Sequence, residues 1–242
     1  MNMLSIDGSH GEGGGQVLRT CLALSAITGR PVRIENIRAG RRKPGLRPQH
    51  LTGVRAAAKI CAAKAEGAKL NAQVLTFVPG AAPQSGDYTF DVAQAAKGGS
   101  AGSVSLILQT VLLPLALAEG TSKLTLRGGT HVSWSPAFDF IKRVYLPTLG
   151  QAGLKAKANI RKWGWYPLGG GEVQVTVQGS TEGALLALDR QQRGSLVRVR
   201  GLSASSNLPK HIRIRQERAC LLYTSPSPRD RSAYLVCRLL LE

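Results

Sequence analysis

Residues 6–19, IDGSHGEGGGQVLR, lead from an apolar segment into a helix through a loop rich in glycine. Residues 3–7 have the composition of a strand, and the apolar side chains of residues 15–28 recur at helical spacing. The glycines between these two segments punctuate the chain and permit a sharp change of direction. The stretch therefore predicts a strand, a glycine loop and a helix, which together open a βα unit.

The elements that follow occur twice in the same order, as judged from periodicity and glycine punctuation. The first series is predicted as strands at residues 3–7 and 31–37, helices at 15–28 and 49–63, and two further strands up to residue 78. The second series is predicted as strands at residues 86–92, 122–127, 154–162 and 171–178, with helices at 102–118 and 136–151. A duplicated βαβαββ unit with a period of roughly 80 residues explains this order most simply, and two unrelated segments are the alternative. The predicted fold class is α+β.

The predicted domain boundaries follow from this pattern. Residues 1–180 are expected to form one large domain that contains both repeated units. After Gly179 the pattern changes to a polar lead-in, a strand at residues 195–202 and a basic helix that starts near Pro209. We interpret residues 181–219 as the beginning of a smaller α/β domain.

The charge of the chain points to partners that carry phosphate. Lys and Arg number 32 against 14 Asp and Glu, which gives a net charge of +18, and the cations are spread along the sequence. A hydrophobic content of 43% is enough to fill a globular core. Nucleic acid or nucleotide binding is the expectation, and a basic surface that merely keeps the protein soluble is the alternative.

The cysteines and the hydropathy of the chain indicate where in the cell the protein is expected. The four cysteines form no CxxC pair and no basic, apolar leader precedes Asp7, so we expect reduced thiols in a cytoplasmic setting. The longest apolar run, residues 104–118, is interrupted by Gln109 and is too short to span a bilayer. It is predicted as a core helix, and no membrane role is implied.

The glycine loop excludes two common nucleotide motifs. Counted from Gly11, the sixth position of a dinucleotide-binding G-x-G-x-x-G motif is Gln16, and no Lys-Ser or Lys-Thr follows the glycines as in a P-loop. The loop can still present backbone amides to an anion at a helix N-terminus, with Arg19 one turn further on. Glu12 would repel a bare phosphate, whereas a carboxylate can hold a Mg²⁺ or Mn²⁺ ion that bridges polyphosphate oxygens. The alternative is that Glu12 only complements the helix dipole.

Residues 36–51, NIRAGRRKPGLRPQHL, place five cations in a loop stiffened by two glycines and two prolines: Arg38, Arg41, Arg42, Lys43 and Arg47. Several guanidinium groups held in set directions can surround one phosphate. We therefore predict a phosphate site in this loop, beside the helix that starts near Gln49. A solvated run of charge is the alternative.

Three further stretches carry weaker signals. In residues 97–115, KGGSAGSVSLILQTVLLPL, the glycines and serines fit a second anion contact or tight helix packing, and Gln109 needs a partner, either a bound base or ribose or a backbone group. In residues 127–144, Ser135 and Pro136 are predicted to start a helix. The aromatic side chains of residues 163–166 fit either stacking on RNA bases or packing at a turn.

These motifs together resemble the RNA 3'-terminal phosphate cyclase family. The resemblance runs in order through IDGSHGEGGGQVLR, IRAGRRKPGLRPQHL, GSAGSVSLILQTVLLP, GGTHVSWSPAFDF and GWYPLGGGEV, and covers about residues 3–219. It implies three copies of the βαβαββ unit, with a smaller domain inserted before the third. It also implies a reaction in which ATP adenylylates a histidine, AMP passes to an RNA 3'-phosphate, and the vicinal 2'-OH attacks to give a 2',3'-cyclic phosphate.

The resemblance further implies roles for individual residues. Glu12 matches a metal and ATP contact; Arg19, Arg38, Arg41 and Gln49 match contacts to ATP or RNA phosphate; Gln109 and Pro136 match positions near the nucleotide. The implied cofactors are ATP and Mg²⁺ or Mn²⁺, and the implied partner is RNA with a 3'-terminal phosphate. No segment indicates an obligate protein partner.

The family's nucleophilic histidine belongs to the third copy of the unit. None of His10, His50, His131 and His211 lies in the matching motif, so no nucleophile is assigned and this chain is expected to be inactive by itself. Two other functions stay open: a non-catalytic relative that acts in ribosomal RNA processing, and a general RNA-binding module. The presence of Glu12, Arg19, Arg41 and Gln109 favours the enzyme.

The last residues have a composition of their own. Residues 220–230, CLLYTSPSPRD, and residues 235–242, LVCRLLLE, match translations of the two ends of a transposase-type sequencing-library adaptor. We interpret residues 220–242 as a non-native tail that follows a gene fragment ending near Ala219. A native Ser-Pro tail is the alternative.

Overall fold

The computed structural model describes residues 2–96, 99–180, 185–189, 191–192, 194–195, 199–222 and 240–241. The chain divides into two units, Met1–Leu188 and Asp189–Glu242, each of which is described by itself. The first unit contains both predicted repeats.

The first repeat has the predicted βαβαββ order. Its elements are β1 (Leu4–Asp7), α1 (Gly15–Thr28), β2 (Val32–Glu35), α2 (Pro48–Ile60), β3 (Lys64–Glu66) and β4 (Leu75–Val78). The sheet order is β1-β2-β4-β3, with β1 parallel to β2 and the other two pairs antiparallel. Because β1 and β2 are parallel neighbours, α1 serves as the crossover between them.

The second repeat has the same topology. Its elements are β5 (Asp87–Asp91), a 3₁₀ turn (Val92–Ala95), α3 (Val104–Ala116), β6 (Gly120–Gly128), α4 (Phe138–Phe140), a π-helical segment (Ile141–Tyr145), α5 (Leu146–Gln151), β7 (Lys155–Lys162) and β8 (Gly171–Gly179). The sheet order β5-β6-β8-β7 places a parallel pair and two antiparallel pairs in the same relation as in the first sheet. The predicted α+β fold with repeated βαβαββ units is confirmed.

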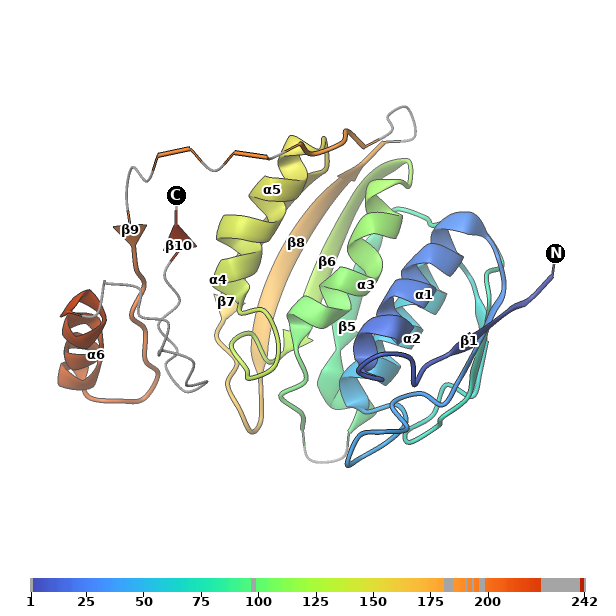
Figure 1. Cartoon of the computed structure of the whole chain (residues 1–242), viewed down its shortest axis with the longest axis horizontal. Helices are drawn as coiled ribbons and strands as arrows, with labels where there is room; N and C mark the ends of the chain where they lie inside the picture. The colour runs from blue at the N-terminus through green and yellow to red at the C-terminus, as the bar shows by residue number, and fades with distance from the viewer. Residues whose placement is uncertain are drawn as a thin grey trace. The chain divides into compact units, whose positions relative to one another are not determined.

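The helices of the two repeats pack on one another. Helices α1 and α3 lie side by side with α2 beside them, and all three pairs are in contact (Figure 1). Val54 and Ala57 of α2 join the core of the first sheet, while Ala56 and Ile60 join the core of the second. Adjacent faces of one helix therefore bind the two repeats together.

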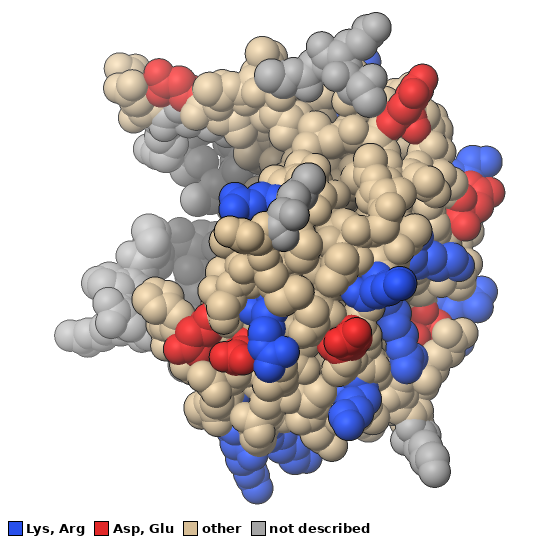
Figure 2. Space-filling model, turned by 90° about the vertical axis from the view of Figure 1, so that its right-hand side faces the viewer, with Lys and Arg blue, Asp and Glu red and all other residues tan. Residues whose placement is uncertain are grey.

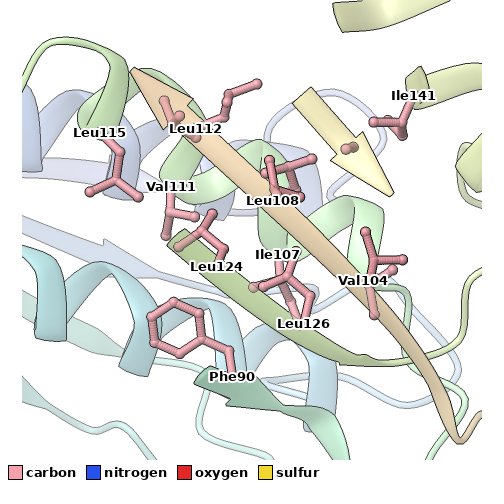
Figure 3. Packing of buried hydrophobic residues seen from close by; sticks show 14 of the residues in the cluster. Phe90, Val104, Ile107, Leu108, Val111, Leu112, Leu115, Leu124, Leu126 and Ile141 are labelled. Carbon is pink, nitrogen blue, oxygen red and sulfur yellow. The ribbon is translucent and has the colours of Figure 1, made fainter. Parts of the chain in front are cut away.

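Helix α3 is buried on most of its circumference, as the apolar run predicts. Its side chains pack with Phe90, Leu124 and Leu126 from β5 and β6 (Figure 3). Within the described residues, no helix is long and apolar enough to cross a membrane.

The helix predicted over residues 136–151 begins later than expected. The Ser135 hydroxyl donates to the Val132 carbonyl and closes a turn, so it caps no helix. Helix α4 starts at Phe138 after Ala137, and the Phe138 amide donates to the Thr130 carbonyl at the end of β6. The prediction that Pro136 starts the helix was wrong, because these two hydrogen bonds hold Pro136 in the connecting loop.

The second unit contains β9 (Val199–Arg200), which pairs with β10 (Leu240–Leu241), and α6 (Lys210–Leu222). Helix α6 begins at the predicted position, next to Pro209. Of the tail predicted over residues 220–242, residues 223–239 and 242 lie outside the described part of the chain. Cys21 and Cys61 are free thiols, whereas Cys220 is disulfide-bonded, so the expectation of reduced cysteines fails there.

Candidate functional site

The glycine loop ends at a helix N-terminus that no side chain caps. Gly14 is the N-cap residue of α1, and the first turn of the helix contains no acidic residue. Gly11 and Gly13 have φ angles of +62° and +55°, the left-handed region that glycine adopts most easily. The first amides of α1 thus keep their hydrogen-bonding capacity for an anion.

The start of the loop is fastened to the first sheet through Asp7. Its carboxylate accepts hydrogen bonds from the Ser9 amide at 3.0 Å, the Ser9 hydroxyl at 2.7 Å and the Asn36 side chain at 3.2 Å. These hydrogen bonds from Ser9 and Asn36 lower the pKa of Asp7. Asp7 is exposed but fixed through Oδ1, whereas Glu12 is the exposed carboxylate that lies among the glycines of the loop.

Glu12 and Arg41 meet at the open side of the loop. The Arg41 Nη2 atom lies 3.3 Å from Glu12 Oε2, and the side chain of Glu12 is 94% exposed. Arg41 Nη2 also lies 3.2 Å from the position that a Cβ on Gly14 would take. The basic loop therefore reaches the N-cap of α1, and its guanidinium group stands between the helix terminus and the carboxylate.

His50 is a site residue that sequence reasoning missed. Its Nδ1 accepts a hydrogen bond from the Arg47 amide at 3.2 Å, so in the neutral ring Nε2 carries the proton. Nε2 lies directly against Gly15, where it would clash with any Cβ. Burial lowers the pKa of His50 to about 3, with further lowering by Arg38, Arg19 and Arg47. The available signal was its place three residues into a helix that directly follows the basic loop.

Arg19 joins the two repeats. Its Nε donates to Gln109 Oε1 of α3 at 2.8 Å, and its Nη2 donates to Gln16 Oε1 at 2.9 Å. Gln109 Nε2 donates to the same Gln16 oxygen at 3.2 Å, which closes a triangle of side chains. Burial lowers the pKa of Arg19 to about 10. The partners of Gln109 in this structure are therefore protein side chains, not a backbone group.

The other predicted residues lie around this centre. Arg38 Nη1 donates to the carbonyls of Lys43 and Gly45 at 2.7 and 2.8 Å, so it fixes the shape of the basic loop. Gln49 Oε1 accepts from the Ser103 amide at 3.0 Å, at the start of α3. The structure thus pairs Glu12 with Arg41 beside the N-terminus of α1 and Arg19 with Gln109 one turn further along, and it gives Arg38 and Gln49 structural contacts.

The sequence matches the family described as RNA 3'-terminal phosphate cyclase over residues 10–221. The chain belongs to this family. It is 57% identical over 210 residues to an RNA 3'-terminal phosphate cyclase of Nostoc sp. (strain PCC 7120), covering 87% of this chain and 60% of the relative. The cyclases so named from Gloeothece citriformis and Methylococcus capsulatus are each 55% identical, over 90% and 88% of this chain and 62% and 58% of theirs.

The chain spans about 60% of the length of the curated cyclases it matches. Among solved structures, an EPSP synthase from Acinetobacter baumannii aligns with 76% of this chain and 32% of its own at 12% identity. The TM-score of 0.40 is too low for that likeness to inform function.

The side chains around the glycine loop fit a metal site in which the protein supplies few ligands. Among the described residues, no group of three or more His, Cys, Asp or Glu side chains could hold a metal ion by itself. Mg²⁺ commonly binds one or two carboxylates and completes its shell with water and substrate phosphates. A single exposed Glu12 beside a helix N-terminus that no side chain caps would suit a metal that arrives with a polyphosphate.

Net charge alone does not locate this site. On the face shown in Figure 2, Lys and Arg are spread over several places with Asp and Glu among them.

The aromatic segment after β7 packs within the protein, because the rings of Trp163 and Trp165 lie 4.3 and 5.2 Å from that of His131. Tyr166 is 82% exposed and takes no part in that stack.

Proposed function

We propose that the protein belongs to the catalytic members of its family and contributes the ATP-binding part of an ATP-dependent RNA 3'-terminal phosphate cyclase. The observation that carries this proposal is the uncapped terminus of α1, surrounded by Arg19, Arg41 and a neutral His50, with Glu12 at its open side. A binding module that recognised only RNA phosphate would gain nothing from a carboxylate at that position, because Glu12 repels phosphate. Polyphosphate that carries a cation removes this conflict.

The proposed reaction has three displacements at phosphorus. A nucleophile on the enzyme attacks the α-phosphorus of ATP, and diphosphate leaves. An oxygen of the RNA 3'-phosphate then attacks the phosphorus of the bound AMP and releases the enzyme nucleophile. The vicinal 2'-oxygen finally attacks the 3'-phosphorus, loses its proton and expels AMP, which leaves a 2',3'-cyclic phosphate. No histidine of this chain is assigned as the nucleophile.

The residues of the glycine loop and its surroundings divide this work. The α1 amides and Arg41 bind phosphate oxygens, and the Arg19 guanidinium, fixed by Gln16 and Gln109, stabilises negative charge that develops on them. Glu12 would hold a divalent ion, which supplies charge neutralisation on the phosphates when it is bound. His50 donates a hydrogen bond from Nε2 without adding charge.

The proposal also covers the domains, the remaining site residues, the substrate and the cellular location. Residues 1–180 form the two-repeat part of the large domain, residues 181–219 the start of the inserted domain, and residues 220–242 a non-native tail. Pro136 belongs near the nucleotide, and Arg38 and Gln49 near its phosphates or the RNA terminus. The substrate is RNA with a 3'-phosphate, and the location is cytoplasmic.

The test uses the gene completed from its source DNA. The protein is incubated with ATP radiolabelled at the α-phosphate and Mg²⁺ or Mn²⁺, and a covalent protein–AMP adduct is sought after denaturing electrophoresis. We expect an acid-labile adduct that RNA with a 3'-phosphate discharges and RNA with a 3'-hydroxyl does not. Glu12→Ala should abolish the adduct.

The contrary results point to the other functions. RNA binding without any adduct would favour a non-catalytic relative that acts in ribosomal RNA processing. Salt-sensitive binding that ignores the 3'-phosphate and does not need ATP would favour a general RNA-binding module.

A further inference from the structure

A hollow lies at the end of the second sheet where β6 ends and β8 begins. It encloses about 450 Å³ and is lined by Asp91, Ala93, Ser100, Arg127, Gly128, Arg161, Lys162, Leu168, Gly170, Gly171 and Glu172. A space of this size suits a single small ligand. We propose that this hollow binds one ribonucleotide of the RNA strand, upstream of the terminal 3'-phosphate, and the inference rests on the function proposed above.

Two of the cations in the hollow are available to a phosphate. Arg127 is ion-paired with Glu172 at 2.9 Å, so these two charges compensate one another. Arg161 donates only its Nε to Gln174 Oε1, at 2.8 Å, which leaves its terminal nitrogens for other acceptors. Neither Arg161 nor Lys162 has an acidic partner within 4 Å among the residues that the structure describes. The pair therefore provides positive charge for one backbone phosphate.

The acid in the hollow distinguishes a ribonucleotide from a simple anion. Asp91 Oδ1 accepts from the Ala93 amide at 2.8 Å, which fixes the carboxylate at the end of β5 and leaves Oδ2 for another donor. A ribose 2'-OH can donate to this oxygen, whereas DNA lacks the group. Leu168, 68% exposed at the rim, offers an apolar surface to a base.

One short loop, residues 100–103, joins the lining of the hollow to Gln49 of the candidate ATP site. Ser100 lines the hollow, and its carbonyl lies 2.7 Å from the position that a Cβ on Gly169 would take. At the other end of this loop, the Ser103 amide donates to Gln49. RNA that presents its 3'-phosphate beside Gln49 can therefore pass over this loop and place an upstream nucleotide in the hollow.

The test measures binding of a fluorescent RNA eight-mer with a 3'-phosphate to the 242-residue chain, by anisotropy at several salt concentrations. Arg161→Ala/Lys162→Ala is compared with Lys155→Ala/Lys157→Ala, which removes the same charge from the far end of β7. We expect the first variant to lose about tenfold in affinity and about one unit of salt slope, as expected when phosphate contacts are lost. The control variant should bind as the unchanged chain does.

Asp91→Asn provides the second arm. It keeps the oxygen that accepts from Ala93 and removes the charge, so it should reduce the preference for RNA over DNA of the same sequence. Two results would overturn the hollow as a nucleotide site. One is an equal loss of RNA affinity in Arg161→Ala/Lys162→Ala and in Lys155→Ala/Lys157→Ala. The other is an unchanged affinity and salt slope in Arg161→Ala/Lys162→Ala. ATP binding, followed separately, should be the same in all variants. Absence of RNA binding by the unchanged chain would overturn this inference, whereas the protein–AMP adduct of the completed protein tests the proposed function separately.

Discussion

The two repeats each contain a glycine-rich loop between their first strand and their first helix, yet the loops differ in what surrounds them. In the first repeat, a Cβ on Gly11 would meet nothing within 4 Å, and one on Gly14 would meet only Arg41. In the second repeat, a Cβ on Gly102 would lie 2.7 Å from Val92 Cγ1 and 2.9 Å from Gln49 Cβ. The first loop is therefore open at Gly11 and Gly14, whereas the second is closed at Gly102.

This difference shows how two copies of one fold can present different surfaces at the same position. The second loop is covered because the first repeat reaches across with Gln49, whose side chain also accepts from the Ser103 amide. The first loop is left open, with cations and a neutral histidine placed around it. At Gly102 the glycine serves close approach of the backbone, as the packing alternative expects.

The largest effect should come from filling the closed loop. Gly102→Ala is expected to cost about 3 kcal/mol of unfolding free energy, because the added methyl group meets Val92, a fully buried residue. Gly11→Ala is the matched change in the open loop, and its positive φ should cost only about 1 kcal/mol. Thermal unfolding followed by tryptophan fluorescence measures both. If the two substitutions cost the same, the contrast between the loops is wrong.

The sequence predicts the repeated fold well because its signals are local. Apolar spacing and glycine punctuation predicted α1 at Gly15–Thr28 with the same bounds as the structure, and α3 within two residues at each end. The helix predicted from Pro136 ends at Gln151 as expected but begins two residues late, at Phe138, because the Phe138 amide donates to the Thr130 carbonyl. A tertiary contact of this kind leaves no periodic signature in the sequence.

The candidate site was predictable only in part for the same reason. Glu12 and Arg41 could be named because charges in glycine-rich loops are conspicuous. The low pKa of His50 follows first from its burial and then from Arg38, Arg19 and Arg47, and its place early in the helix after the basic loop was the only local signal for it. The triangle of Arg19, Gln16 and Gln109 spans 93 residues of chain, and Gln109 could be singled out only as a polar residue in need of a partner.

The pH dependence of stability should show whether His50, beside the first loop, is neutral in the folded protein. Its pKa of about 3 in the folded protein lies below the value of 6.5 in the unfolded chain, so its stabilising contribution is present above pH 6.5. As the pH falls toward 3, the unfolded state takes up the proton first and this contribution is lost. We expect a loss of about 2 kcal/mol between pH 6.5 and 4.5. His50→Asn, which can still accept from the Arg47 amide, should lack this part of the pH dependence.

Thermal unfolding of both proteins across that pH range supplies the comparison. The difference between them isolates the histidine from the carboxylates that titrate in the same range. Parallel pH profiles would mean that His50 is protonated normally in the folded protein and that its assignment as a neutral ring, with Nδ1 as an acceptor, fails.

Gly15→Ala should disturb both His50 and the bound ligand. The new methyl group would clash with the ring of His50, which is buried, and lie 2.8 Å from Arg19 Nη1. Stability should fall by about 1 to 2 kcal/mol, because the helix preference of alanine offsets only part of the clash. Affinity for ATP with Mg²⁺, measured by equilibrium dialysis, should fall about tenfold. A variant that binds ATP normally would place the ligand elsewhere.

Glu12→Gln should change stability least, but it should change most strongly how the affinity for ATP depends on metal. The pair of Glu12 and Arg41 is largely exposed, so Glu12→Gln is expected to alter the unfolding free energy by less than about 0.5 kcal/mol. Without metal, the variant should bind ATP slightly better, because a negative charge has left the open loop. With Mg²⁺, the unchanged protein should gain affinity and the variant should gain much less. Equal gains in the two proteins would show that the carboxylate does not hold the ion, and the first loop would then differ from the second by its openness to anions alone.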